Sequence, residues 1–148
     1  MPKRFLHRWY LVCYSIEYPG DLLKKGSRDT KILIVDDNKE LVGIIQEMLS
    51  PERYEIMSAA DGQIGYFTFL LFNPDLVITD IHMPGKNGVE LMKLIRTHKS
   101  MVKTIYMSGN LSRWNSLLEE EKLRYPVSIL QKPFSRQELI RSLAQLSS

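Results

Sequence analysis

Runs of consecutive apolar residues alternate with longer stretches of periodic apolar positions from Thr30 onward. The run 32–35 has no polar residue between its apolar ones, and this pattern is typical of a strand buried on both faces. Comparable runs predict five strands, at 31–35, 54–58, 76–79, 104–107 and 127–130.

The stretches between these runs carry apolar residues at helical spacing. In the first of them, Leu41, Ile45 and Leu49 recur on one side of a helix, with Asn38 placed to cap its start. Similar patterns predict helices at 64–72, 89–95, 114–118 and 139–146. Five alternations of strand and helix predict an α/β fold, with a doubly wound parallel sheet covered by helices on both faces.

The predicted helix 64–72 is unusually apolar. Ile64, Phe67, Leu71 and Phe72 are too many for one buried face. We therefore expect some of them to be exposed, or covered either by a partner or by the N-terminal segment.

Composition indicates one folded domain, at 30–148, preceded by an extension at 1–29. The chain has 148 residues, of which 44% are hydrophobic and 25% charged, a normal balance for a globular domain. Residues 1–29 contain six of the 20 basic residues and three of the 17 acidic residues. Residues 30–148 therefore contain fourteen basic and fourteen acidic residues. This neutral body argues against direct nucleic-acid binding through bulk charge.

The extension 1–29 has two interpretations. It is either a flexible extension or a docking arm whose contacts are Phe5, Trp9, Tyr10 and Tyr14. Its apolar run is too short for a membrane span. Cys13 is the only cysteine, so an intramolecular disulfide is excluded, and we expect a reducing, cytoplasmic location.

Polar side chains follow four of the predicted strands where each strand ends. These residues are Asp36 and Asp37, Asp80, Ser108 with Gly109, and Lys132. The carboxyl ends of parallel strands share one edge of a sheet, so we expect them to meet there. Three crowded carboxylates require a compensating charge, which Mg²⁺ and a lysine can supply. Such a site is suited to stabilising a transferred phosphoryl group.

Four motifs at these positions resemble those of the receiver domain of two-component response regulators. They are VDDN at 35–38, DIHMPGKNG at 80–88, MSG at 107–109 and KPF at 132–134. The resemblance covers the chain from about Thr30 to its end and implies a flavodoxin-like fold of five strands and five helices. It also implies a signalling switch rather than an enzyme, although such a domain can catalyse its own phosphorylation and dephosphorylation.

The resemblance implies a role for each site residue. Asp80 would accept a phosphoryl group from a phosphohistidine on a sensor histidine kinase or a phosphotransfer protein. Ser108 and Lys132 would contact that group, Gly109 would leave access to it, and the Lys132–Pro133 bond would be cis. The Mg²⁺ ligands would be Asp36, Asp37, Asp80 and the backbone carbonyl of His82.

One position departs from the family pattern. Receivers usually have Tyr or Phe three residues before the lysine, where this chain has Ile129. We expect either that switching depends on another side chain or that signalling is weaker.

Two functions fit the whole chain. The first is a stand-alone receiver that binds a downstream protein through its fourth helix, fifth strand and fifth helix. The alternative is a small Mg²⁺-dependent aspartyl-phosphate phosphatase or phosphotransferase of related fold, such as a haloacid-dehalogenase-like enzyme. Those enzymes need an acid two residues after the nucleophile, and here that residue is His82.

Overall fold

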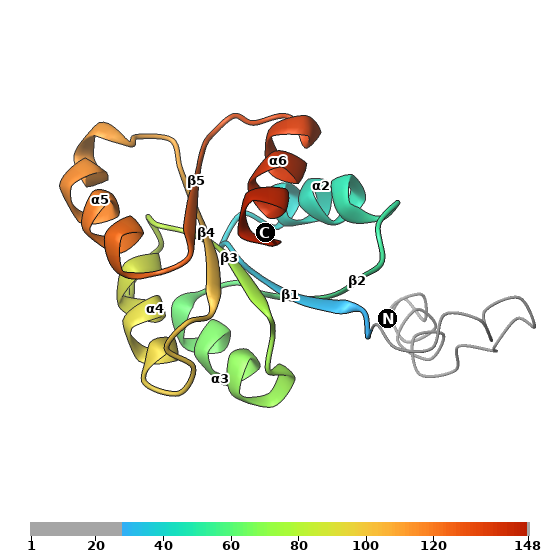
Figure 1. The fold of residues 1–148 in the computed structure, drawn as a ribbon, viewed down its shortest axis with the longest axis horizontal. Coiled ribbons are helices and arrows are strands. Elements are labelled where there is room, and N and C mark those ends of the chain that lie inside the picture. Colours follow the sequence, from blue (N-terminus) through green and yellow to red (C-terminus); the bar gives the residue numbers. More distant parts are fainter. Residues whose placement is uncertain (1–27, 148) are drawn as a thin grey trace, which may run out of the picture.

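A parallel sheet in the order β2-β1-β3-β4-β5 forms the centre of the computed structural model, which describes residues 28–147 (Figure 1). Each of the five predicted strands is present. Their bounds are Thr30–Val35 for β1, Tyr54–Ala59 for β2, Leu76–Asp80 for β3, Lys103–Ser108 for β4 and Val127–Gln131 for β5. All five residues of β3 are buried, which confirms its prediction as a central strand.

Helices cover both faces of the sheet (Figure 1). They are α2 (Lys39–Leu49), α3 (Gly62–Phe72), α4 (Gly88–Arg96), α5 (Asn115–Arg124) and α6 (Arg136–Ser147). Side chains of α2 and α6 pack on one face, around Ile34 and Ile78 of the sheet. Side chains of α3, α4 and α5 pack on the other, around Leu33 and Val77. The predicted doubly wound α/β fold is therefore confirmed.

Side-chain caps explain where three of these helices begin. Asn38 accepts hydrogen bonds from the backbone N–H groups of the first turn of α2. Asp61 does the same for α3. Asn87 and Glu90 form a reciprocal capping box at the start of α4. Each cap satisfies backbone donors that a helix start leaves unpaired, and those of α2 and α4 directly follow the loops that carry site residues.

The start of α5 differs from the prediction. A short 3₁₀ turn, η1 (Ser112–Trp114), precedes the helix, so Trp114 lies before α5 rather than within it. Asn110 explains the turn, because its side-chain oxygen accepts hydrogen bonds from the Ser112 hydroxyl and from the backbone N–H of Arg113. Such local bonds compete with an α-helical start.

The apolar excess on α3 is exposed, as expected for some of its residues. Ile64, Phe67 and Leu70 are about half exposed, and Leu71 is 90% exposed. Phe69 is buried in the core beside the sheet, and Phe72 is also buried. Among the described residues, no helix is both long enough and apolar enough to span a membrane.

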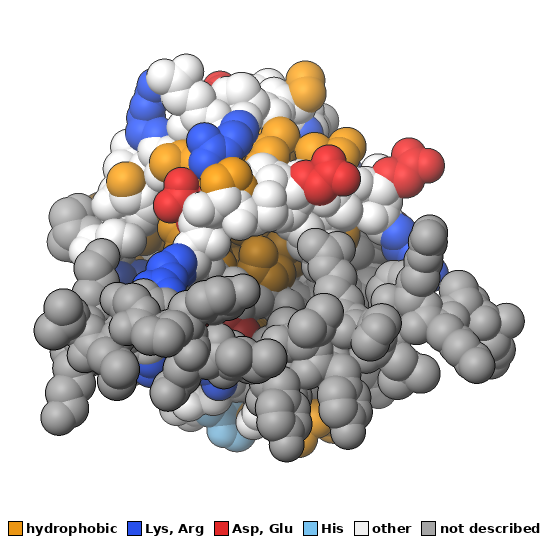
Figure 2. Space-filling model, turned by 90° about the vertical axis from the view of Figure 1, so that its right-hand side faces the viewer, with side chains coloured by type: hydrophobic (Ala, Val, Ile, Leu, Met, Phe, Trp, Pro, Cys, Tyr) orange, Lys and Arg blue, Asp and Glu red, His pale blue; other side chains and the backbone are white. Residues whose placement is uncertain are grey.

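The last two residues of the extension expected at 1–29 are described, and one of them contacts the folded body. Arg28 forms an ion pair with Asp75, which also accepts a hydrogen bond from the backbone N–H of Lys31. Residues 1–27 lie outside the described residues, and so do the contacts suggested for a docking arm. Figure 2 shows charges of both signs interspersed with apolar side chains on the coloured part of one face.

Candidate functional site

The site lies at the carboxyl edge of the sheet, where four neighbouring strands end. Asp36 and Asp37 follow β1, Asp80 is the last residue of β3, Ser108 is the last residue of β4 and Lys132 follows β5. One carboxylate oxygen from each of the three aspartates lies within 4.8 Å of the others. The strand order therefore brings the three predicted carboxylates together.

Lys132 connects two of these aspartates. Its Nζ lies 2.9 Å from Asp36 Oδ2 and 3.2 Å from Asp80 Oδ1. The other carboxylate oxygen of Asp36 accepts a hydrogen bond of 2.8 Å from the backbone N–H of Asn38. Because both oxygens of the buried Asp36 are engaged, this side chain is fixed in one orientation.

Burial and charge shift the protonation equilibria of the site in definable directions. Burial raises the pKa of Asp80, and the charges of Asp36 and Asp37 raise it further, whereas Lys132 lowers it. Burial alone would lower the pKa of Lys132, but its bonds to Asp36 and Asp80 and their charges raise it above the ordinary value. The lysine is therefore positively charged at neutral pH, as the clustered carboxylates require.

The three carboxylates can hold a hard divalent cation. Oxygen ligands from several carboxylates suit Mg²⁺, which also retains waters. Asp36 and Asp80 are buried, while Asp37 is exposed, so one side of the cluster is open to solvent. The donor set therefore fits a metal ion, with Lys132 offsetting part of the negative charge.

Ser108 joins the ends of β4 and β5. Its hydroxyl oxygen accepts a hydrogen bond of 3.1 Å from the backbone N–H of Asn110, and its carbonyl accepts one of 2.8 Å from that of Lys132. A side-chain carbon at the next residue, Gly109, would meet no atom within 4 Å. Local packing thus leaves room for a larger residue there. The Lys132–Pro133 bond is cis, as the resemblance implied.

Two residues that support the site were given no role in the prediction from the sequence. The buried hydroxyl of Thr79 donates a hydrogen bond of 3.0 Å to the backbone carbonyl of Asp80. A side-chain carbon at Gly88 would lie 2.2 Å from that same carbonyl oxygen. Helix α4 therefore starts in direct contact with the end of β3. The close approach at Gly88 depends on a loop geometry that no local pattern reveals, and Thr79 reads as an ordinary strand residue.

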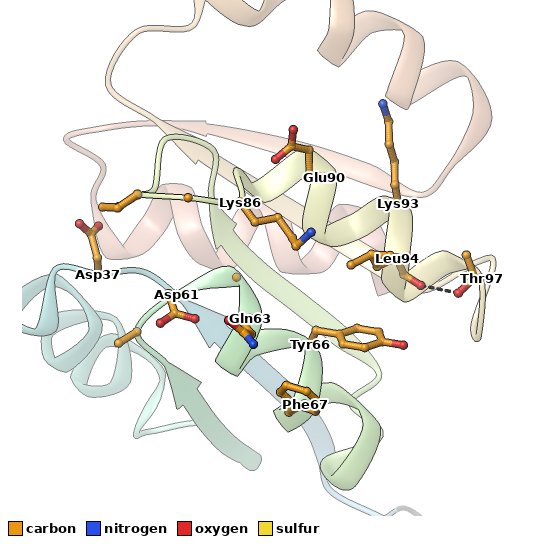
Figure 3. A pocket seen from close by; sticks show the side chains of 14 residues that line it. Asp37, Asp61, Gln63, Tyr66, Phe67, Lys86, Glu90, Lys93, Leu94 and Thr97 are labelled. Atoms are coloured by element: carbon orange, nitrogen blue, oxygen red, sulfur yellow. Dashed lines mark hydrogen bonds between the residues drawn. The ribbon is translucent and has the colours of Figure 1, made fainter.

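A cleft of about 1280 Å³ opens beside the site, between α3 and α4. Figure 3 shows Asp37 at one end of it and, toward the other end, Tyr66 of α3 below Leu94 of α4, while the side chain of Lys93 points away from α3. Its lining mixes aromatic and charged side chains. The exposed carboxylate of Asp37 is therefore reached from a groove, and not only from open solvent.

The sequence between residues 32 and 144 matches the family described as response regulator receiver domain. This match covers most of the chain, so the protein belongs to that family, which acts in two-component signalling. The comparisons give no support to the phosphatase alternative.

Two individual relatives illustrate the similarity. It is 34% identical to the transcriptional regulatory protein CpxR of Klebsiella pneumoniae over 74% of this chain and 46% of that protein. It is 30% identical to sporulation initiation phosphotransferase F of Bacillus subtilis, over 74% of this chain and 86% of that protein. The chain thus spans about half the length of CpxR but most of the length of the phosphotransferase.

Solved structures agree with this assignment. The response regulator TrrA of Thermotoga maritima, in complex with Mg²⁺ and BeF, superposes with a TM-score of 0.69 at 33% identity. That match covers 79% of this chain and 98% of TrrA.

Proposed function

We propose that the protein is a phosphorylatable receiver in which Asp80 accepts a phosphoryl group from a phosphohistidine. The observation that carries this proposal is the position of Lys132, which contacts both Asp36 and Asp80, the last residue of the fully buried strand β3. A carboxylate beside a fixed ammonium group and two further acids can act as a nucleophile toward phosphorus. Family membership supports the same chemistry.

The transfer step uses one carboxylate oxygen of Asp80 as the nucleophile. An oxygen–phosphorus bond forms, the phosphorus–nitrogen bond of the donor breaks, and the imidazole keeps the electron pair and takes up a proton from solvent. Lys132 would pair with the transferred phosphoryl oxygens, and the Ser108 hydroxyl would donate a hydrogen bond to one of them. Asp36, which already holds Lys132, would orient its ammonium group.

Mg²⁺ is the metal that we propose for the site. Asp36, Asp37, Asp80 and the backbone carbonyl of His82 would hold it, and the ion would neutralise charge on the phosphoryl oxygens. The donor set supports this proposal, because three carboxylate oxygens lie within 4.8 Å of one another. The Mg²⁺ and BeF in the TrrA structure belong to that protein and support the choice by similarity.

The proposed partners are a sensor histidine kinase or phosphotransfer protein as donor, and a downstream protein that binds α5, β5 and α6. Leu123 on α5 is 88% exposed and offers an apolar contact on that surface. The stand-alone action and cytoplasmic location expected from the sequence remain predictions.

Incubation with a small-molecule phosphodonor and Mg²⁺, followed by intact mass measurement, tests the assignment. We expect one acid-labile phosphoryl group on the parent protein and none on Asp80→Asn. Asp61→Asn is the matched control, because it removes a partly exposed carboxylate beside the same cleft while keeping a helix-capping side chain. Equal labelling of Asp80→Asn and the parent would refute the role of Asp80.

A further inference from the structure

A cluster of charged and hydroxyl side chains lies buried between α4, α5 and β4, outside the acidic site. Arg96 of α4 forms an ion pair with Glu121 of α5. The hydroxyl of Tyr106 on β4 donates a hydrogen bond of 2.8 Å to Glu121 Oε2, the carboxylate oxygen that also contacts Arg96. The guanidinium group also donates to the Thr104 hydroxyl at 3.3 Å and lies 3.8 Å from the centre of the Tyr125 ring. These contacts join two helices and one strand.

Glu121 differs from the two glutamates that precede it. Glu119 and Glu120 are exposed and pair with Lys122 and Arg124 on the helix surface. The Glu121 side chain is only 8% exposed. A buried carboxylate is costly unless it is paired and hydrogen-bonded. The second half of α5 is therefore held where Glu121 reaches both Arg96 and Tyr106.

The same strand joins this cluster to the candidate phosphorylation site. Side chains alternate along a strand, so Tyr106 and Ser108 lie on the same face of β4. Tyr106 is fully buried in the core beneath α4 and α5. Its neighbour on β5 is Ile129, the position where the family pattern has an aromatic residue. An aromatic side chain therefore stands on the adjacent strand and reaches α5 directly.

The two ends of α5 are attached in different ways. Its first half follows η1 and the exposed or partly exposed residues after Ser108, and it packs on the core through the apolar side chain of Leu118. Its second half carries Glu121 and is followed by Tyr125, against Arg96. A displacement that starts at Ser108 therefore reaches first the half of α5 that is held by apolar packing, whereas the second half is held by the directional bonds of Glu121.

We propose that Tyr106 and Glu121 are positioning residues that make α5 pivot, so that phosphorylation moves its first half while its second half stays fixed. This inference rests on the proposed function, because it requires a phosphoryl group at Asp80. The bond between Tyr106 and Glu121 restrains the outward motion of residues 119–124, and the pair with Arg96 maintains the carboxylate that Tyr106 needs. Ile129 contributes packing but no hydroxyl group.

NMR amide shifts of the full chain, with and without beryllofluoride and Mg²⁺, test the pivot. In the parent we expect shift changes at Asp80, Ser108 and residues 109–118, and small ones at 119–124. Tyr106→Phe removes the hydroxyl and keeps the ring, so changes at 119–124 should grow at least twofold. Tyr125→Phe, which removes the hydroxyl of the ring beside Arg96, should match the parent.

A second variant tests the same proposal in case Tyr106→Phe does not fold properly. The double substitution Arg96→Met with Glu121→Leu replaces the buried pair with apolar side chains of similar size, which folded proteins often tolerate. It should also enlarge the changes at 119–124. A purely structural role would lower stability and leave the distribution of shifts along α5 unchanged.

The outcomes separate the two proposals. Shift changes at Asp80 and Ser108 with the same α5 pattern in the parent and both variants would overturn the pivot alone. No change at Asp80 or Ser108 in the parent would overturn phosphorylation at this site, and the pivot with it. Growth at 119–124 in both variants, absent from Tyr125→Phe, would establish the pivot.

Discussion

The ammonium group of Lys132 donates a hydrogen bond of 2.9 Å to Asp36, a residue 96 positions earlier in the chain. Asp36 is 1% exposed, whereas the Lys132 side chain keeps 24% exposure. The lysine therefore neutralises a carboxylate that is withdrawn from solvent. A divalent cation held by the same carboxylates would share this electrostatic role with Lys132.

Replacing Lys132 with Met should strengthen Mg²⁺ binding and weaken phosphorylation. Removing a positive charge about 3 Å from two candidate ligands takes away repulsion toward the cation, so we expect Mg²⁺ to bind several-fold more tightly. Phosphoryl transfer should slow at least tenfold, because the same charge would stabilise the phosphoryl oxygens. Titration calorimetry and the labelling assay measure the two effects. Lys122→Met, at an exposed pair with Glu119, is the control, and weaker Mg²⁺ binding by Lys132→Met would contradict the argument.

Gly88 is the glycine whose substitution should damage the site most directly. A side-chain carbon there would lie 2.2 Å from the Asp80 carbonyl oxygen and 3.0 Å from the Thr79 hydroxyl. Relieving this overlap must shift the end of β3 or the start of α4, so Gly88→Ala should destabilise the protein by about 1–3 kcal/mol. It should also slow labelling of Asp80. Urea unfolding measures the first effect.

Gly43 supplies the matched control for this substitution. It lies inside α2, where a side-chain carbon would meet no atom within 4 Å. Alanine favours the helix over glycine, so Gly43→Ala should stabilise the protein by roughly 0.5–1 kcal/mol. Similar unfolding midpoints for the two variants would show that the contact at Gly88 is relieved without cost.

The fold and the acidic site could be predicted because their signals are local. Uninterrupted apolar runs marked the buried strands, and Asp36, Asp80 and Lys132 each stand at or directly after a strand end. In a parallel sheet these ends meet at one edge, so knowing the strands was enough to place the side chains together. The cap Asn38 was predictable for the same reason, since a cap acts within one helical turn.

The buried cluster around Glu121 could not be predicted. Three consecutive glutamates, at 119–121, are typical of a solvated helix surface. Only the pairing of Glu121 with Arg96, 25 positions earlier, distinguishes it from the other two. Arg96 itself reads as a basic residue that favours the end of a helix. The burial of both charges depends on how α4 and α5 pack, and α5 shows little apolar periodicity that would orient it.

Asp80 should make the stability of the metal-free protein depend on pH in a defined direction. Its pKa is raised in the folded state, first by burial and then by Asp36 and Asp37, against the lowering effect of Lys132. Between the ordinary carboxyl pKa and this raised one, the folded state binds more protons than the unfolded state, so the free energy of unfolding falls as pH rises through that window. Above it, the ionised Asp80 destabilises the fold. Asp80→Asn should therefore be more stable than the parent at neutral pH.

The size of this difference at each pH provides the test. Urea unfolding in the presence of a chelator, from about pH 8 to about pH 4, should show the advantage of Asp80→Asn shrinking as pH falls through the raised pKa, because the parent then becomes protonated too. Mg²⁺ affinity of the parent should fall over the same window, since a proton and the cation compete for one carboxylate. Asp61→Asn is the control, because it removes a carboxylate that caps a helix outside the acidic cluster. An advantage of Asp80→Asn that grows toward low pH would mean that Lys132, rather than burial, dominates the environment of Asp80.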